Sequence, residues 1–412
     1  KPPRNTKKTV MSSSSSYMDT STGAVEHCET MASLHPDLAT QYNTISSLFS
    51  RKLWHQLTIT ILDFVSTPTS TLRLTASGGN SYLSLYDRVV LTCDKKLNQL
   101  TLSRIAAAVA ASLLKDGNDY VAARATLENL LEKKARLGPA PTLYIESQLA
   151  LLHLNHMEMS NEMDAKLLRS IKETLASGDA ILQEMDAAQT DATVVHSSYY
   201  EASMTYRKAV GTPEAYYREA LLFLNYTPNV APKRRYQIAT DVSLAALTGD
   251  GVFNFGEIVT HNILESLKGT ENQWLLDLMT VFANGNVFEF RKITAAHAKD
   301  IEGQPALTSR AELVQEKITL LALVNMVFER PSAERTLDFQ DVAERTGVEL
   351  EKVEWVIMRA LSLGLIKGSM DQVDETVTVS WVMPRVLDNS QLKALASRFA
   401  DWAVKVSKTK DY

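Results

Sequence analysis

From residue 46 onward, the apolar residues recur at three- and four-residue steps, which is the periodicity of amphipathic α-helices. Phe49, Leu53, Leu57, Ile61 and Phe64 form one such stripe. Residues 105–114 are rich in alanine and apolar on nearly all sides, as expected of an inner helix. The pattern predicts a mainly α-helical protein.

Turns that contain glycine separate the predicted helices. They occur at Gly117, at Gly211, at Gly249 and at Gly285. The last three are 38 and 36 residues apart (211 to 249 and 249 to 285), which is close to the period of tetratricopeptide (TPR) repeats. We therefore expect a TPR-like helical-repeat solenoid over residues 41–270, because stacked helix pairs of this kind offer long surfaces to protein partners.

One pair of glycines in these turns, Gly251 and Gly256, has the spacing of a phosphate-binding loop. Such a loop continues with lysine and a hydroxyl residue, which bind phosphate and magnesium, whereas Glu257 and an isoleucine follow here. A dinucleotide fingerprint that starts at Gly249 would need a third glycine where Asn254 stands. We expect no nucleotide and no other cofactor, and we interpret these glycines as turns between helices.

The periodicity changes in the last third of the chain. Three helices are predicted over residues 313–328, 342–345 and 349–363, followed by a short strand at 365–368 and an alternating strand at 376–383. This order predicts a winged helix over 313–384, with a small two-stranded β wing, inside a domain that spans 271–387. Its structural core is expected to contain Val356, Ile357, Leu361, Val377, Val379 and Trp381.

A winged helix often reads DNA, which requires arginine, lysine or amide side chains on the recognition helix. Residues 349–361 instead carry three glutamates against Lys352 and Arg359. The whole chain has a formal net charge of -5 and a pI near 6.0. These charges disfavour nucleic acid as the partner.

The final segment, residues 388–412, is predicted to form one more helix. Its apolar residues are separated by three, four, three and four positions, the seam of helix-on-helix packing; they are Leu392, Leu395, Phe399, Trp402 and Val406. The helix either folds back onto its own domain or docks into a bundle supplied by other chains. The second interpretation is favoured, because large aromatic side chains dominate protein interfaces.

The first forty residues differ from the rest in composition. A basic start is followed by five consecutive serines, and few large apolar residues precede Leu34. A transit peptide shares the basic, serine-rich start but requires an amphipathic helix. We therefore expect residues 1–40 to be a disordered tail.

Composition also limits the class of protein. The two cysteines lack the C-x-x-C spacing, which indicates a reducing compartment. No apolar run approaches the roughly 18 residues that span a bilayer, so no membrane partner is expected.

Signatures of catalysis are missing from the sequence. There is no H-x-H, H-E-x-x-H or G-x-S-x-G motif. His153 and His156 share a helix face, Cys93 is a single thiol, and residues 233–235 are a basic run after a proline; each has a simpler structural explanation. We expect no enzymatic activity, no catalytic residue and no bound metal.

Helical repeats that run into a winged helix are the architecture of PCI domains, which occur in the proteasome lid, the signalosome and translation initiation factor three. Five segments closely resemble the PCI-domain, non-ATPase lid subunits of the 26S proteasome regulatory particle: residues 52–58, 249–257, 273–275, 359–374 and 381–388. The resemblance covers roughly residues 45–405 and excludes the serine-rich start and the 66–85 loop.

The resemblance implies a non-catalytic scaffold that supports ubiquitin-dependent degradation in the cytoplasm and nucleus. Its winged helix would meet neighbouring PCI lid subunits, and its C-terminal helix would join a bundle with the metalloprotease-fold (MPN) deubiquitinase pair. The ubiquitin receptor subunit is a further expected neighbour. The alternatives are a PCI subunit of the signalosome or of initiation factor three, or a winged-helix protein that faces nucleic acid.

Overall fold

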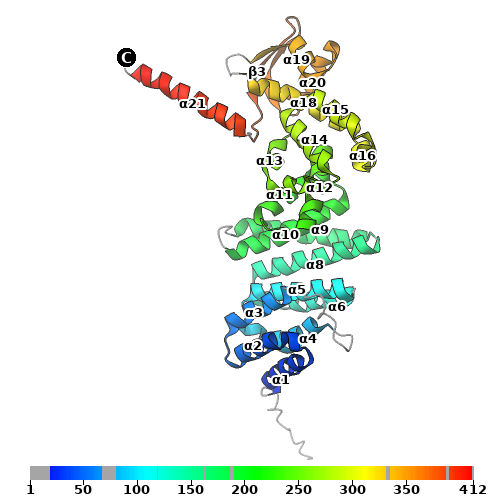
Figure 1. Cartoon of the computed structure of the whole chain (residues 1–412), viewed down its shortest axis with the longest axis vertical. Coiled ribbons are helices and arrows are strands. Elements are labelled where there is room, and N and C mark those ends of the chain that lie inside the picture. Colours follow the sequence, from blue (N-terminus) through cyan, green and yellow to red (C-terminus); the bar gives the residue numbers. More distant parts are fainter. Residues whose placement is uncertain are drawn as a thin grey trace, which may run out of the picture. The chain divides into compact units, whose positions relative to one another are not determined.

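The chain is mainly α-helical, as the periodicity predicts, with a single small sheet among the residues described (Figure 1). The computed structural model describes residues 19–66, 80–117, 119–161, 163–185, 190–330, 335–386 and 389–410. It divides into two compact units, Lys1–Tyr206 and Arg207–Tyr412. A helical-repeat region followed by a winged helix is the predicted order of elements, and it is confirmed.

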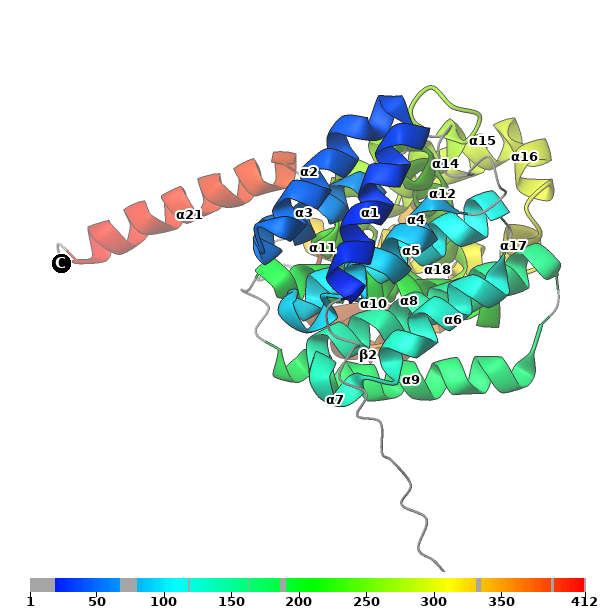
Figure 2. The same ribbon diagram turned by 90° about the horizontal axis from the view of Figure 1, so that it is seen from below.

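The first unit is built from helices that pack on their neighbours along the chain. Contacts join α1 to α2, α2 to α3, α3 to α5, α5 to α6 and to α8, and α8 to α9 (Figure 2). Tyr42, Phe64 and Tyr82 meet edge to face in its core, with ring centroids 5.3 and 5.5 Å apart. The elements are α1 (Asp19–Leu34), η1 (Pro36–Leu38), α2 (Ala39–Ser50), α3 (Trp54–Ser66), α4 (Ser81–Leu85), η2 (Tyr86–Val90), η3 (Asp94–Lys96), α5 (Gln99–Gly117), α6 (Tyr120–Leu131), α7 (Lys134–Leu137), α8 (Pro139–Ser160), α9 (Ala165–Glu184) and α10 (Thr190–Val210), which continues into the second unit.

The expected disordered tail over residues 1–40 is corrected by helix α1. Ala24, Cys28, Met31 and Leu38 are buried in the same core as α2 and α3. Two of these buried positions are filled by the small residues alanine and cysteine. The segment therefore lacks the dense run of large apolar residues that predicts a folded region. Residues 1–18 lie outside the described part of the chain.

The second unit begins at Arg207, so the last helical repeats belong to the same compact unit as the winged helix. Its elements after α10 are α11 (Pro213–Tyr226), α12 (Pro232–Thr248), α13 (Phe255–Thr260), η4 (Asn262–Leu267), α14 (Gln273–Asn284), α15 (Val287–Ala296), α16 (Ala298–Glu302), α17 (Pro305–Thr308), α18 (Ala311–Glu329), β1 (Thr336–Asp338), α19 (Phe339–Thr346), α20 (Leu350–Ser362), β2 (Ile366–Asp371), β3 (Thr376–Val382) and α21 (Asn389–Lys410).

The winged helix has three strands in the order β1-β3-β2, all antiparallel, where the sequence suggested two. Strand β1 is three residues long and buries one of them, Leu337, opposite Val377. A single buried residue is too short a signal for the alternating pattern of a strand. The helices α18, α19 and α20 pack against this sheet, and Val356, Ile357, Val377 and Val379 are buried in the shared core, with Leu361 partly buried at its edge.

Trp381 departs from the expected core, because its side chain is 38% exposed. A β-bulge explains the difference: Gly368 pairs with Val379 and Lys367 pairs with Trp381, which leaves Ser380 as an extra residue in β3. The alternation therefore shifts by one position, and Val382, opposite buried Ile366, takes the inward place. The Lys367 ammonium instead lies 4.9 Å from the centroid of the outward-facing Trp381 ring.

Gly285 ends α14 in a left-handed conformation, with φ of 60°. A Cβ added there would meet the Leu321 carbonyl oxygen of α18 at 2.8 Å and also the Asn325 side chain. Gly285→Ala should therefore lower the free energy of unfolding by about 3 kcal/mol, from left-handed strain plus the clash with backbone.

Gly211→Ala is the matched control for that change. Gly211 also has a positive φ, 79°, but an added Cβ would meet nothing within 4 Å. It should cost only the strain, about 1–2 kcal/mol. Urea unfolding of both variants measures the difference, and equal losses would show that α14 and α18 are not in close contact at this glycine.

Candidate partner-binding surfaces

Helix α21 (Asn389–Lys410, red in Figure 1) exposes the apolar seam that its sequence predicts. Phe399 and Trp402 are 62% and 64% exposed, and Leu392, Leu395 and Val406 are exposed as well. At about 100° per residue these five positions lie within an arc of about 80° on one side of the helix. Contiguous exposed apolar surface of this kind marks an interaction site, whereas single exposed residues do not. We name these five residues the seam.

One flank of the seam is basic. At about 100° per residue, Arg398 and Lys405 lie about 80° to 100° from the middle of the seam, both on the same side of it, whereas Lys393 and Asp401 lie toward the opposite side of the helix. Val404 is also exposed, but it lies on the opposite side of the helix from the seam. The seam is thus an exposed apolar stripe with cations along one edge.

Helix α20 (Leu350–Ser362) exposes a second apolar feature, which the sequence analysis missed. Trp355 is 53% exposed and Met358, three positions later, is exposed beside it. The other side of the helix is buried in the winged-helix core. The detectable signal was the i, i+3 pair of large apolar residues on the otherwise polar face.

Both cations of α20 are already engaged within the chain. Lys352 forms an ion pair with Glu349 at 2.9 Å, and the Arg359 Nε donates to Glu316 Oε1 at 2.6 Å. Glu354 accepts a hydrogen bond from Gln372 of the wing at 3.0 Å. The helix that would face DNA therefore presents tryptophan, methionine and carboxylates, which are poor ligands for phosphate.

The glycine stretch at 249–257 is the end of one helix and the start of the next, as interpreted from the sequence. Helix α12 ends at Thr248 and α13 begins at Phe255, and Gly251 between them has a positive φ of 73°. Two cations of the second unit cap the carbonyl end of α12. Arg310 Nη1 donates to the Thr248 carbonyl at 2.7 Å. The 249–257 stretch is therefore a turn between α12 and α13 that is held by contacts with the cations of neighbouring helices.

Lys317 of α18 is the second capping cation and is 1% exposed. Its Nζ donates to the Ala246 carbonyl at 2.8 Å and to the Gly249 carbonyl. The rings of Phe253 and Phe255 lie 5.9 and 5.8 Å from the same ammonium. Burial lowers the pKa of Lys317 to about 8, which the nearby Asp250 partly opposes. Sequence periodicity places Lys317 on a buried helix face but gives no reason for a charge there.

The histidine pair is part of the packing between α6 and α8. The Tyr120 hydroxyl and His153 Nδ1 are 2.6 Å apart, and the Tyr120 ring stacks on His156 with centroids 3.9 Å apart. Burial lowers the pKa of His153 to about 4. Within the described ranges no group of three His, Cys, Asp or Glu side chains is placed to hold a metal ion.

The structure also gives a packing role to the two remaining candidates from the sequence, the single thiol and the basic run. Cys93 is buried, and burial raises the pKa of its thiol to about 12, which opposes a nucleophilic thiolate. Helix α12 begins at Pro232, so the basic run at 233–235 forms its first turn, where Arg235 donates to the Asn262 carbonyl.

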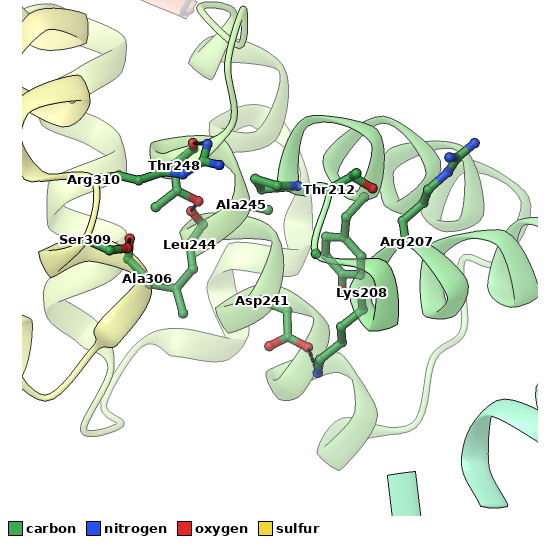
Figure 3. A pocket seen from close by; sticks show the side chains of 13 residues that line it. Arg207, Lys208, Thr212, Asp241, Leu244, Ala245, Thr248, Ala306, Ser309 and Arg310 are labelled. Carbon is green, nitrogen blue, oxygen red and sulfur yellow. Dashed lines mark hydrogen bonds and ion pairs between the residues drawn. The ribbon is translucent and has the colours of Figure 1, made fainter. Parts of the chain in front are cut away.

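A cavity of about 280 Å³ lies beside the start of α11 and the C-terminal half of α12 in the second unit (Figure 3). Some of its polar groups pair with one another: Lys208 Nζ donates to Asp241 Oδ2 at 2.6 Å, and Arg310 Nη1 donates to the Thr248 carbonyl. The floor is apolar, with Leu244 and Ala245. The lining holds no histidine or cysteine, and Asp241, its single carboxylate, is paired with Lys208.

In the portion of the chain that the structure covers, no helix has the length and apolar content required to cross a bilayer.

Comparison with known proteins separates the possible classes of helical-repeat and winged-helix protein. Residues 41–279 match the family model for PSD13 N-terminal repeats, and residues 294–381 match the PCI domain. The chain is 32% identical to the 26S proteasome non-ATPase regulatory subunit 13 homolog A of Arabidopsis thaliana over 392 residues, 94% of this chain and 96% of the relative. The chain belongs to the family of 26S proteasome non-ATPase regulatory subunit 13.

Other members and neighbours of the subunit 13 family agree with this assignment. The 26S proteasome regulatory subunit RPN9 of Saccharomyces cerevisiae is 30% identical over 393 residues, 91% of each chain. A translation initiation factor 3 subunit M from Yarrowia lipolytica is 31% identical over only 134 residues, 32% of each chain. Similarity to initiation factor 3 subunit M therefore covers less than half of the chain, whereas similarity to subunit 13 extends over nearly all of it.

Proposed function

We propose that this chain is a non-catalytic scaffold subunit of the lid of the 26S proteasome regulatory particle, where it supports ubiquitin-dependent protein degradation. The observation that carries the proposal is the seam of α21, five apolar side chains that remain exposed on a 22-residue helix. Isolated helices are marginal in water, and their apolar faces are buried by partners in stable assemblies. The membership of the subunit 13 family identifies the assembly as the proteasome.

The seam of α21 is assigned to a helical bundle with other lid subunits, including the MPN deubiquitinase pair. Its repeating steps of three and four residues fit knobs-into-holes packing, and Phe399 and Trp402 are its anchors. The exposed Trp355 and Met358 of α20 are assigned to a neighbouring PCI subunit, because the adjacent cations are neutralised within the chain. The ubiquitin receptor subunit is a further proposed neighbour, and the cytoplasm and nucleus are the proposed compartments.

Purification of the tagged chain from its own cells tests the proposal. We expect the other PCI subunits and the MPN pair to co-purify in equal amounts with it and to remain bound in 0.5 M salt, roughly, because apolar contacts are not screened. Recovery of the chain alone, or with initiation factor or signalosome subunits, would contradict the assignment.

A salt titration with duplex DNA tests the nucleic-acid alternative on the same preparation. Proteins that contact six or more phosphates lose about a thousandfold in affinity between 50 and 200 mM salt. The paired cations of α20 predict no such dependence. Tight, steeply salt-dependent binding would instead favour a nucleic-acid-facing protein.

A further inference from the structure

We propose that residues 383–386, which connect the winged helix to α21, form a strap that docks on residues 254–256, and that Gly256 and Asn254 are positioning residues for α21. This inference rests on the proposed function, since it concerns how the seam is presented to the lid. It assigns a role to Gly256, the third glycine of the 249–257 stretch, which the turn between α12 and α13 leaves unexplained.

Gly256 is required by the approach of the strap. A Cβ added at this position would lie 2.6 Å from the Val386 carbonyl oxygen and 3.2 Å from the Val386 Cβ. Gly256 is the second residue of α13, and its φ is not positive, so its own conformation does not demand glycine. Glycine inside a helix costs about 1 kcal/mol relative to alanine. The close passage of a second backbone segment accounts for its presence here.

Asn254 holds the strap by a hydrogen bond. The Val386 backbone N–H donates to Asn254 Oδ1 at 3.4 Å, across 132 positions of the sequence. Asn254 directly precedes α13, a place where an asparagine oxygen usually caps the helix, yet its side chain makes no capping bond. The oxygen is therefore turned away from its own helix and toward the strap.

The strap is also fixed on its other side. The Met383 N–H donates to the Leu365 carbonyl at 2.8 Å, and the Arg385 guanidinium lies 4.7 Å from the centroid of the Phe328 ring. Burial lowers the pKa of Arg385, as expected where the chain covers it. Pro384 between them restricts the backbone further. Consecutive residues are thus held by α13, α18 and the end of the wing.

The consequence concerns where the seam begins. Residues 387 and 388 alone separate Val386 from Asn389, the first residue of α21. Three Cα–Cα steps span at most about 11 Å, so a docked strap confines the root of α21 to that distance from Val386. Confinement before binding lowers the entropy lost when the seam enters a partner groove, which raises the affinity for that partner.

Two variants of the full-length chain test the strap. Gly256→Ala introduces the clash, and Asn254→Ala removes the acceptor without adding volume. Gly303→Ala is the control, because its added Cβ would meet nothing closer than 3.4 Å. Hydrogen–deuterium exchange of peptides that cover residues 383–390 reports on the strap, and capture by co-expressed lid subunits reports on its purpose.

We expect exchange at the strap to rise about fivefold in Gly256→Ala and Asn254→Ala, the effect of one lost hydrogen bond, while peptides from α12 and α14 stay unchanged. Capture by the lid subunits should weaken by a similar factor. If exchange does not change in either variant, the strap is not docked. If exchange rises and capture does not weaken, the strap does not position α21. Either result would contradict the strap alone: if mutation of the seam still abolishes capture, the proposed scaffold function stands. If mutation of the seam has no effect on capture, the proposed scaffold function is wrong.

Discussion

Phe399→Asp combined with Trp402→Asp is expected to abolish incorporation of the chain into the lid while leaving the chain folded. Both side chains are more than 60% exposed, so neither supports the core of either unit. Truncation of a large aromatic side chain at the centre of an interface typically costs about 2 kcal/mol or more of binding free energy. The introduced aspartate adds the cost of burying a carboxylate in the interface. Two such losses correspond to a decrease in affinity of about 1,000-fold. Co-expression with the other lid subunits and pull-down on a partner's tag measures the change.

Val404→Asp provides the matched control for this experiment. Val404 is an apolar residue of the same helix with comparable exposure, but it lies away from the seam. The same charge there should leave capture within about twofold of wild type, and the melting temperature of all variants should agree. Unimpaired capture of the double variant, or equal impairment by Val404→Asp, would show that α21 does not bind through the seam.

Repetition and periodicity made most of the fold predictable. The burial of α18 follows from its dense run of apolar residues, and the buried positions of α20 and of the first half of β3 follow from steps of 3.6 and 2 residues; all are local properties of the chain. Helix α1 was not predicted from the sequence, because its buried positions are filled partly by alanine and cysteine, which contribute little to an apolar pattern. Trp381 was misplaced because the bulge at Ser380 is specified by the pairing of β3 with β2 and not by β3 alone.

The candidate surfaces likewise include features that local spacing predicts and contacts that it does not. The seam was predictable because all five residues belong to one helix and obey one spacing. The docking of Val386 on Asn254 joins segments 132 residues apart, and no local pattern records such a contact. The same holds for Lys317, whose carbonyl partners lie 71 and 68 residues earlier. Long-range contacts of single residues are thus the part of the site that requires the structure.

Lys317 carries the second large expected effect, on stability. Lys317→Met keeps most of the side-chain volume but leaves the Ala246 and Gly249 carbonyls without their donor at the buried end of α12. An unsatisfied buried carbonyl costs about 1–3 kcal/mol, so the variant should lose about 3 kcal/mol of unfolding free energy at pH 7, after allowance for the charge that no longer needs to be buried. Urea unfolding of wild type and variant measures the loss. Lys299→Met, at an exposed position of α16, should change stability by less than about 0.5 kcal/mol.

The same lysine predicts how that difference depends on pH. Burial holds the pKa of Lys317 at about 8 in the folded chain, against 10.5 for the ordinary side chain. Between these two values the unfolded chain binds more protons at this position, so the contribution of Lys317 to the unfolding free energy rises with pH across the window. The span of 2.5 units, at 1.36 kcal/mol each, sets an upper limit of about 3 kcal/mol. Because other groups titrate alike in both proteins, the gap between wild type and Lys317→Met should widen from pH 8 to pH 10.5 and stay constant from pH 6 to pH 7.5. A flat gap above pH 8 would mean that burial does not lower the pKa of Lys317 in the folded protein, and a gap that narrows would mean that the Ala246 and Gly249 carbonyls and Asp250 outweigh burial; either result would contradict the prediction.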